Sequence, residues 1–326
     1  MTAETAGSTA RLRALFARMA LAAAALTFIV IVASAFMRHA QAGLSCGDWP
    51  ACYARIAAPD ADTLPGTGVR VARIAHRLAA TGVLALVIGM LLIAWTQAPA
   101  WKREGALALW ALAIAMALAV LGIATPGARL PAVTLGNLLG GYAMLAVLAT
   151  TAAPASAAPN SARKLAKLAL ALAFVQTALG GMMGAQFAAL VCPALVDCGP
   201  WSWPAFADGG AWNPLHTPAL IEGHLAAPDG AAGLHVLHRL NGVVLAATAL
   251  AAAAAQHHVR PRLAFSLTGL VLAVAALGAA AVSPQPALAF VVAHNAGAAL
   301  LVALLGSAAA KSRLGDAASA GATGRN

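Results

Sequence analysis

The chain has 326 residues, of which 61% are hydrophobic and only 9% are charged. This composition excludes an ordinary soluble domain of this length and indicates a membrane protein. A formal net charge of +10 would also suit a nucleic-acid binder, but the basic residues alternate between segments as they do in membrane proteins. We therefore expect a lipid bilayer, and no nucleic acid, as a partner.

Eight apolar runs recur along the chain, each of about 20 residues and so long enough to cross about 30 Å of hydrocarbon. Ala and Leu dominate these runs and helix breakers are few, which predicts helices and not barrel strands. The first run lacks a clean cleavage site, so we expect a span and not a signal peptide. The runs are 19–37, 71–95, 105–124, 132–152, 168–189, 231–255, 263–282 and 287–309.

With the N-terminus inside, the inner segments hold 13 of the 20 Lys and Arg residues and the outer segments hold 7. The positive-inside rule then predicts that both termini are cytoplasmic. All four cysteines fall in two outer loops, as the pairs Cys46 with Cys52 and Cys192 with Cys198. Such close pairs can form disulfides in an oxidising compartment, and two pairs of free thiols are the alternative.

Two stretches of the chain resemble each other, which indicates a duplication. RIAHRLAATGV surrounds His76 and VLHRLNGVV surrounds His238, and each follows a cysteine pair. The last helices of the two halves also correspond, with Asn137 aligned to His294. The pattern predicts an all-α integral membrane protein of eight helices in two four-helix-bundle repeats. The expected parts are a cytoplasmic tail 1–18, a first repeat 19–152, a cytoplasmic linker 153–167, a second repeat 168–309 and a cytoplasmic tail 310–326.

A histidine inside a membrane helix is costly unless it binds something. His238 and His294 lie inside helices at similar depth, where two imidazoles from neighbouring helices can ligate haem iron axially. Arg239 could then pair with a propionate. Structural hydrogen bonding within the bundle is the alternative for the histidines. Small residues nearby, Gly242 and Gly297, leave room for a macrocycle or serve close helix packing.

The first repeat offers a less complete ligand set. His76 occupies the position of His238, but its expected partner is Asn137, a poorer iron ligand than imidazole. The first site is therefore five-coordinate or differently liganded. Three other histidines could each reach over it: His39, His216 and His224.

The stretches AQAGLSCGDWPACY, QTALGGMMGAQFAALVCPALVDC and AHNAGAALL, together with the two His-Arg helices, resemble haem A synthase over residues 19–309. Members of that family are membrane enzymes of cytochrome oxidase assembly. The resemblance implies an oxidoreductase that converts a methyl group of haem O to a formyl group, by successive hydroxylations and loss of water. It also implies a bacterial-type inner membrane location, a haem b cofactor in the second half, and haem O in the first. Haem O synthase and an electron donor are the suggested partners, and a homo-oligomer stays open.

Carried over by motif, His238 and His294 would be the axial ligands of haem b. His76 would be the catalytic residue that faces and binds the substrate haem iron. The pairs Cys46–Cys52 and Cys192–Cys198 would match the outer cysteine pairs of the family.

Two positions depart from the family pattern, and both fall in the substrate site. Arg73 stands where many members have Glu, and Asn137 stands where they have His. We expect His76 alone to bind the substrate iron, with Asn137 as a hydrogen-bond donor. Arg73 and Arg77 are further substrate-site candidates, because each could bind a propionate. The alternative function is a non-catalytic haem-binding or electron-transfer paralogue with a degraded first site.

Overall fold

The computed structural model describes residues 3–44, 46–55, 66–98, 100–125, 129–153, 158–192, 194–195, 198, 209–282 and 287–310. Eight long helices dominate this part of the chain: α1 (Ala3–Gln41), α2 (Thr67–Thr96), α3 (Lys102–Ala124), α4 (Pro131–Ala152), α5 (Asn160–Ala185), α7 (Ala231–Gln256), α8 (Pro261–Ala281) and α9 (Leu288–Ala309).

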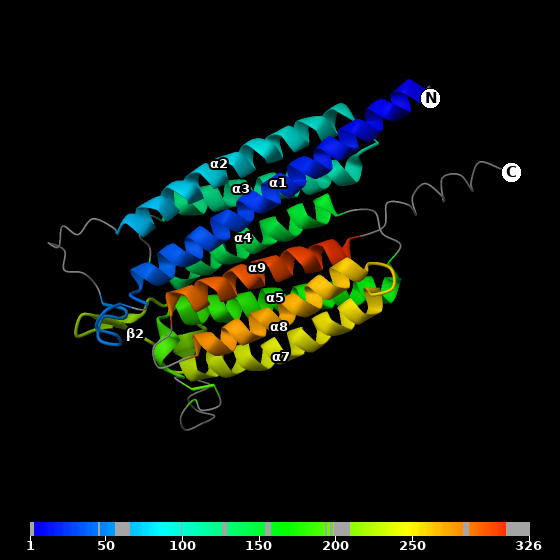
Figure 1. Ribbon diagram of the computed structural model, residues 1–326. Helices are drawn as coiled ribbons and strands as arrows, with labels where there is room; N and C mark the ends of the chain where they lie inside the picture. The colour runs from blue at the N-terminus through cyan, green and yellow to red at the C-terminus, as the bar shows by residue number, and fades with distance from the viewer. Residues whose placement is uncertain are drawn as a thin grey trace.

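All eight helices are long and apolar enough to cross a membrane. At about 1.5 Å per residue, a helix of this kind needs about 20 residues to span the hydrocarbon layer, and the shortest, α8, has 21 residues. The helices run side by side, with the cysteine loops at one end and the start of α1 and the end of α9 at the other (Figure 1). The predicted all-α membrane fold is confirmed.

Each half of the chain forms a ring of four helices with the same order of contacts. In the first half α1 packs on α2, α2 on α3, α3 on α4, and α4 back on α1; in the second half α5, α7, α8 and α9 do the same. The rings meet through α1, α4, α5 and α9, which occupy the middle of the molecule in Figure 1. Helix α1 therefore touches α9, a helix of the other half.

Small side chains bring the two rings close together. An added Cβ on Gly306 of α9 would lie 3.0 Å from the backbone oxygen of Ala146 on α4. At the same place the hydroxyl of Thr150 donates to the oxygen of Gly306 over 3.1 Å. Glycine at this position thus permits a backbone approach that is typical of membrane helix interfaces.

Two boundaries differ from the sequence expectation. Helix α1 begins at Ala3, so most of the expected tail 1–18 is a continuous extension of the first span. Helix α5 begins at Asn160, inside the expected linker 153–167. Both extensions are polar or mixed in sequence, and hydropathy does not detect helix that continues beyond the membrane. Of the expected tail 310–326, residues 311–326 lie outside the described part.

The second cysteine loop is followed by a hairpin that hydropathy did not predict. Strands β1 (Ala219–Ile221) and β2 (His224–Ala226) pair antiparallel, and Arg55, just after the first cysteine loop, bridges to His224. The hairpin therefore joins the two cysteine loops at one end of the molecule (Figure 1).

Candidate functional site

The first cysteine loop is closed by the disulfide Cys46–Cys52, with the two Cα atoms 6.2 Å apart. Gly43 enters this loop with a φ of +79°, and an added Cβ there would lie 2.7 Å from the backbone oxygen of Cys52. Only glycine suits both the left-handed backbone and the close approach. The cysteines of this predicted pair are joined in the structure.

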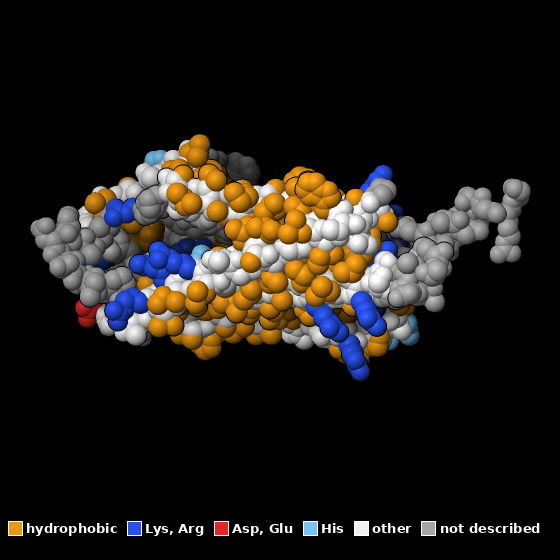
Figure 2. All heavy atoms as spheres, turned by 90° about the horizontal axis from the view of Figure 1, so that it is seen from above, with side chains coloured by type: hydrophobic (Ala, Val, Ile, Leu, Met, Phe, Trp, Pro, Cys, Tyr) orange, Lys and Arg blue, Asp and Glu red, His pale blue; other side chains and the backbone are white. Residues whose placement is uncertain are grey.

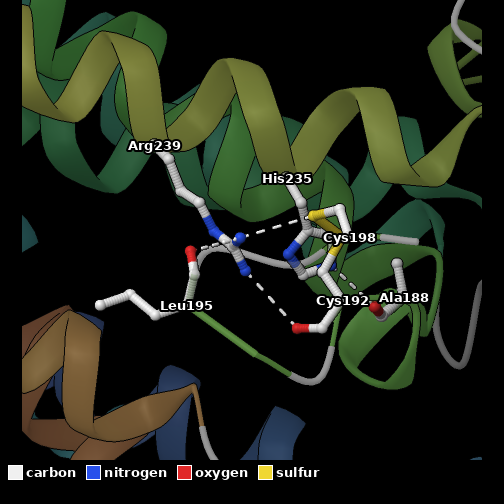
Figure 3. Close-up of a disulfide and its surroundings, with 6 residues drawn as sticks. All are labelled: Ala188, Cys192, Leu195, Cys198, His235 and Arg239. Carbon is white, nitrogen blue, oxygen red and sulfur yellow. Dashed lines mark hydrogen bonds between the residues drawn. A yellow bond between two sulfur atoms is a disulfide. The ribbon is translucent and has the colours of Figure 1, made fainter. Parts of the chain in front are cut away.

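The second cysteine loop is closed by Cys192–Cys198, and its main partner is Arg239 of α7 (Figure 3). The guanidinium donates to the oxygen of Leu195 over 2.7 Å and to Cys198 Sγ over 3.4 Å. On the turn before, His235 Nε2 donates to the oxygen of Ala188 over 2.8 Å. Arg239 thus fastens the loop to the helix, and its binding of a propionate stays a prediction.

The hairpin docks on the first loop through polar and apolar contacts. His224 Nδ1 donates to the oxygen of Tyr53 over 3.0 Å, and the amide of Leu225 donates to the oxygen of Ala54 over 3.0 Å. A cavity of about 470 Å³ lies between the loops, and Phe187 is among its mostly apolar lining residues. Burial raises the pKa of Tyr53 to about 12, so its phenol is neutral at ordinary pH.

His238 of α7 and His294 of α9 face each other within the second ring. Their ring centres are 6.5 Å apart and the planes are inclined at 62°. Two nitrogens on opposite sides of one metal ion lie about 4 Å apart, and roughly 1 Å more on each side reaches the ring centres, giving about 6 Å. The separation therefore fits two imidazoles bound to one haem iron.

The hydrogen bonds of the two rings differ. His294 Nδ1 donates to the oxygen of Val274 on α8 over 3.0 Å, which leaves the lone pair on Nε2 available to a metal. His238 Nε2 accepts from the amide of Gln176 on α5 over 3.1 Å, and Gln176 Oε1 accepts from Asn241 over 2.7 Å. His238 Nδ1 is buried and has no hydrogen-bond partner in the described structure. The donor chemistry fits an axial ligand pair, with Gln176 as the contact that iron binding at Nε2 would replace.

Two glycines that sequence reasoning missed lie directly against these rings. An added Cβ on Gly180 of α5 would lie 2.9 Å from His238 Cε1, and one on Gly278 of α8 would lie 2.9 Å from His294 Cε1. Gly180 follows Gln176 by four residues and so shares its helix face. The four-residue spacing was the only sequence signal for Gly180. It could be interpreted only after the structure showed His238 against this face of α5.

Gly242 and Gly297, the small residues near the two histidines, lie at close helix contacts. An added Cβ on Gly242 would meet the Gln176 amide at 3.1 Å, and one on Gly297 would meet Val274 Cγ2 at 2.7 Å. Of the two roles that the sequence left open, the structure favours close packing.

The candidate substrate-site residues of the first half are more exposed than the two facing histidines. His76 is half-buried on α2, whereas Arg73 and Arg77 on the same helix are exposed. Asn137 on α4 is exposed and donates to the oxygen of Val133 in its own helix over 3.1 Å. Figure 2 shows basic side chains and a histidine at a hollow near the end of the molecule that holds the outer loops. The roles expected for these residues stay predictions.

Comparison with known proteins decides the family. The family of cytochrome oxidase assembly proteins named COX15-CtaA matches residues 68–305. A haem A synthase of Shewanella oneidensis (strain MR-1) is 30% identical over 311 residues, which cover 86% of this chain and 91% of that protein. The chain belongs to the haem A synthase family. Members of the family are assembly proteins of cytochrome oxidase, and the match includes both His-Arg helices and the facing histidines.

Proposed function

We propose that this protein is a haem A synthase that oxidises the methyl group of haem O to a formyl group. The observation that supports this most directly is the pair of imidazoles, 6.5 Å apart, inside a chain of this family. The relative that is 30% identical bears the same function in its name. Eight apolar helices make it a multi-pass membrane protein, and we propose a bacterial inner membrane.

The second ring would hold haem b between His238 and His294. The oxygen of Val274 keeps the proton of His294 on Nδ1, and Gln176 orients the ring of His238. The Val274 contact fixes the direction of the ligating nitrogen of His294 before the cofactor arrives, whereas Gln176 would give way to the iron at His238 Nε2. Haem b bound there would supply one-electron transfer to or from the substrate site.

The first ring would hold haem O, the substrate. His76 is half-buried on α2 and hydrogen-bonds to no described residue, so its imidazole is available to an iron ion. Arg73 and Arg77 lie one turn before it and directly after it, exposed and able to bind the propionates. Asn137 donates one amide hydrogen to the oxygen of Val133, and the second could donate to the substrate.

The test is haem extraction from cells that express this chain together with a haem O synthase. We expect mass determination to find the formyl product, haem A. His76→Ala should abolish the product, because the substrate iron loses its ligand. His257→Ala is the matched control, since His257 lies in the short segment after α7. Unchanged product in the His76 variant would remove His76 from the mechanism.

The second candidate function is a haem-binding or electron-transfer paralogue without catalysis. It is favoured by Arg73 and Asn137, which stand where the family often has Glu and His, and by the turn of Asn137 toward its own helix. In this case the cells would accumulate haem O, while the purified chain would still contain low-spin haem b.

A further inference from the structure

Arg38, near the outer end of α1, is an interior cation with no described counter-ion. Its Nε is buried and has no hydrogen-bond partner in the described structure. Its only side-chain hydrogen bond there is with His39 Nε2, at 3.5 Å. No carboxylate of the described chain lies within salt-bridge distance. A guanidinium whose Nε is buried without a partner, and which has no counter-ion, is costly, so its position points to an anion that the bound form supplies.

The contacts of α1 place Arg38 beside the second ring, although α1 belongs to the first half. Arg38 lies near Tyr142 of α4. The hydroxyl of Tyr142 donates to the oxygen of Asn295 over 3.0 Å, and Asn295 directly follows His294. The path from Arg38 to this histidine thus crosses the boundary between the two halves.

A second path leads to the other histidine. The ring of His39 lies 3.6 Å from the position of an added Cβ on Gly184 of α5. One helical turn before Gly184, Gly180 is the residue that meets the His238 ring. Two neighbouring residues of α1 therefore lie beside α4 and α5, the helices that contact Asn295 and the His238 ring.

We propose that Arg38 binds a propionate carboxylate of the haem held between His238 and His294, so that α1 completes the second-half site. The inference rests on the haem b site of the proposed function. A carboxylate is the group that a guanidinium binds best, through paired hydrogen bonds. The sequence predicts this task for Arg239, and in the structure the guanidinium of Arg239 hydrogen-bonds the second cysteine loop.

The test compares two forms of the cofactor, haem b and its dimethyl ester, which lacks free carboxylates. The full chain is purified in detergent from haem-depleted cells and titrated spectroscopically with each form. We expect Arg38→Gln to weaken haem b binding by about tenfold or more, because a charge-assisted hydrogen bond is lost. The same variant should bind the dimethyl ester as tightly as the unmodified chain does. Arg38→Lys should recover part of the loss.

Arg70→Gln is the matched control, because Arg70 is an exposed arginine at the outer end of α2; it should bind both forms normally. Equal losses for haem b and the ester would show that Arg38 only supports the fold, and would overturn the inference. Unchanged haem b binding in Arg38→Gln would overturn it too. An unmodified chain that binds neither form would instead refute the haem site on which the proposed function depends.

Discussion

His238 and His294 are equivalent in position but not in how their orientation is fixed. The partner of His294 is a backbone oxygen, that of Val274, which no substitution removes. The partner of His238 is the side chain of Gln176, itself oriented by Asn241. A substitution at position 176 can therefore change the orientation of His238 on α7, whereas no single side-chain replacement removes the partner of His294 on α9.

A methyl group at position 278 should disturb the ligand pair. In Gly278→Ala the added carbon would lie 2.9 Å from His294 Cε1 and 3.1 Å from Nδ1, so the ring must shift. We expect haem content per chain to fall by about tenfold, the scale of a misplaced metal ligand. Pyridine haemochrome spectra measure it. Gly269→Ala on the same helix is the control, because an added Cβ there meets nothing within 4 Å; equal haem contents would contradict the prediction.

Asn137→His should strengthen the first site. Imidazole is a better iron ligand than an amide, and the exposed position of Asn137 leaves the larger ring room to turn. We expect the purified variant to retain more haem O than the unmodified chain, measured by extraction and mass determination. Asn137→Gln keeps an amide and should not retain more. Equal gains in both variants would show that side-chain size, and not iron ligation, is responsible.

At the scale of elements, hydropathy predicted every membrane span, since apolar length is a property of each segment alone. The duplication also indicated His238 and His294 as a pair, because it placed both histidines at a similar depth in the predicted membrane spans. The sequence alone did not predict the contacts of Arg239 and Gly278, because each contact depends on where another segment lies after folding. The hairpin 219–226 was missed for a related reason: its three-residue strands are stabilised by the first cysteine loop and not by their own sequence.

The hairpin should depend on His224 for its docking. His224→Ala removes the hydrogen bond to the oxygen of Tyr53, a net loss of about 1 kcal/mol. We expect faster amide hydrogen exchange at Leu225, which donates to Ala54 beside it. His216→Ala, an exposed change in the same loop, should leave the exchange unaltered. Equal exchange in both variants would show that the His224 hydrogen bond is not needed to hold the hairpin.

On the scale of the whole molecule, two rings of helices share one seam and one cap. The seam is formed by α1, α4, α5 and α9, and the cap by the two cysteine loops joined through the hairpin. We propose that the rings are repeats of one ancestral unit, each with a haem site. A shared seam lets one ring contribute residues to the site of the other.

The basic residues predict the orientation of this assembly in the membrane. The helix ends opposite the cysteine loops hold Lys102, Arg103, Arg163, Lys164 and Arg260, and basic residues stay on the cytoplasmic side. Alkaline phosphatase inserted in the segment 56–65 should therefore be active, because this enzyme requires export. The same insertion after His258, in the short turn between α7 and α8, is the matched control and should be inactive. The reverse result would place His76 and the His238–His294 pair near the cytoplasm and exclude an oxidising compartment for the disulfides.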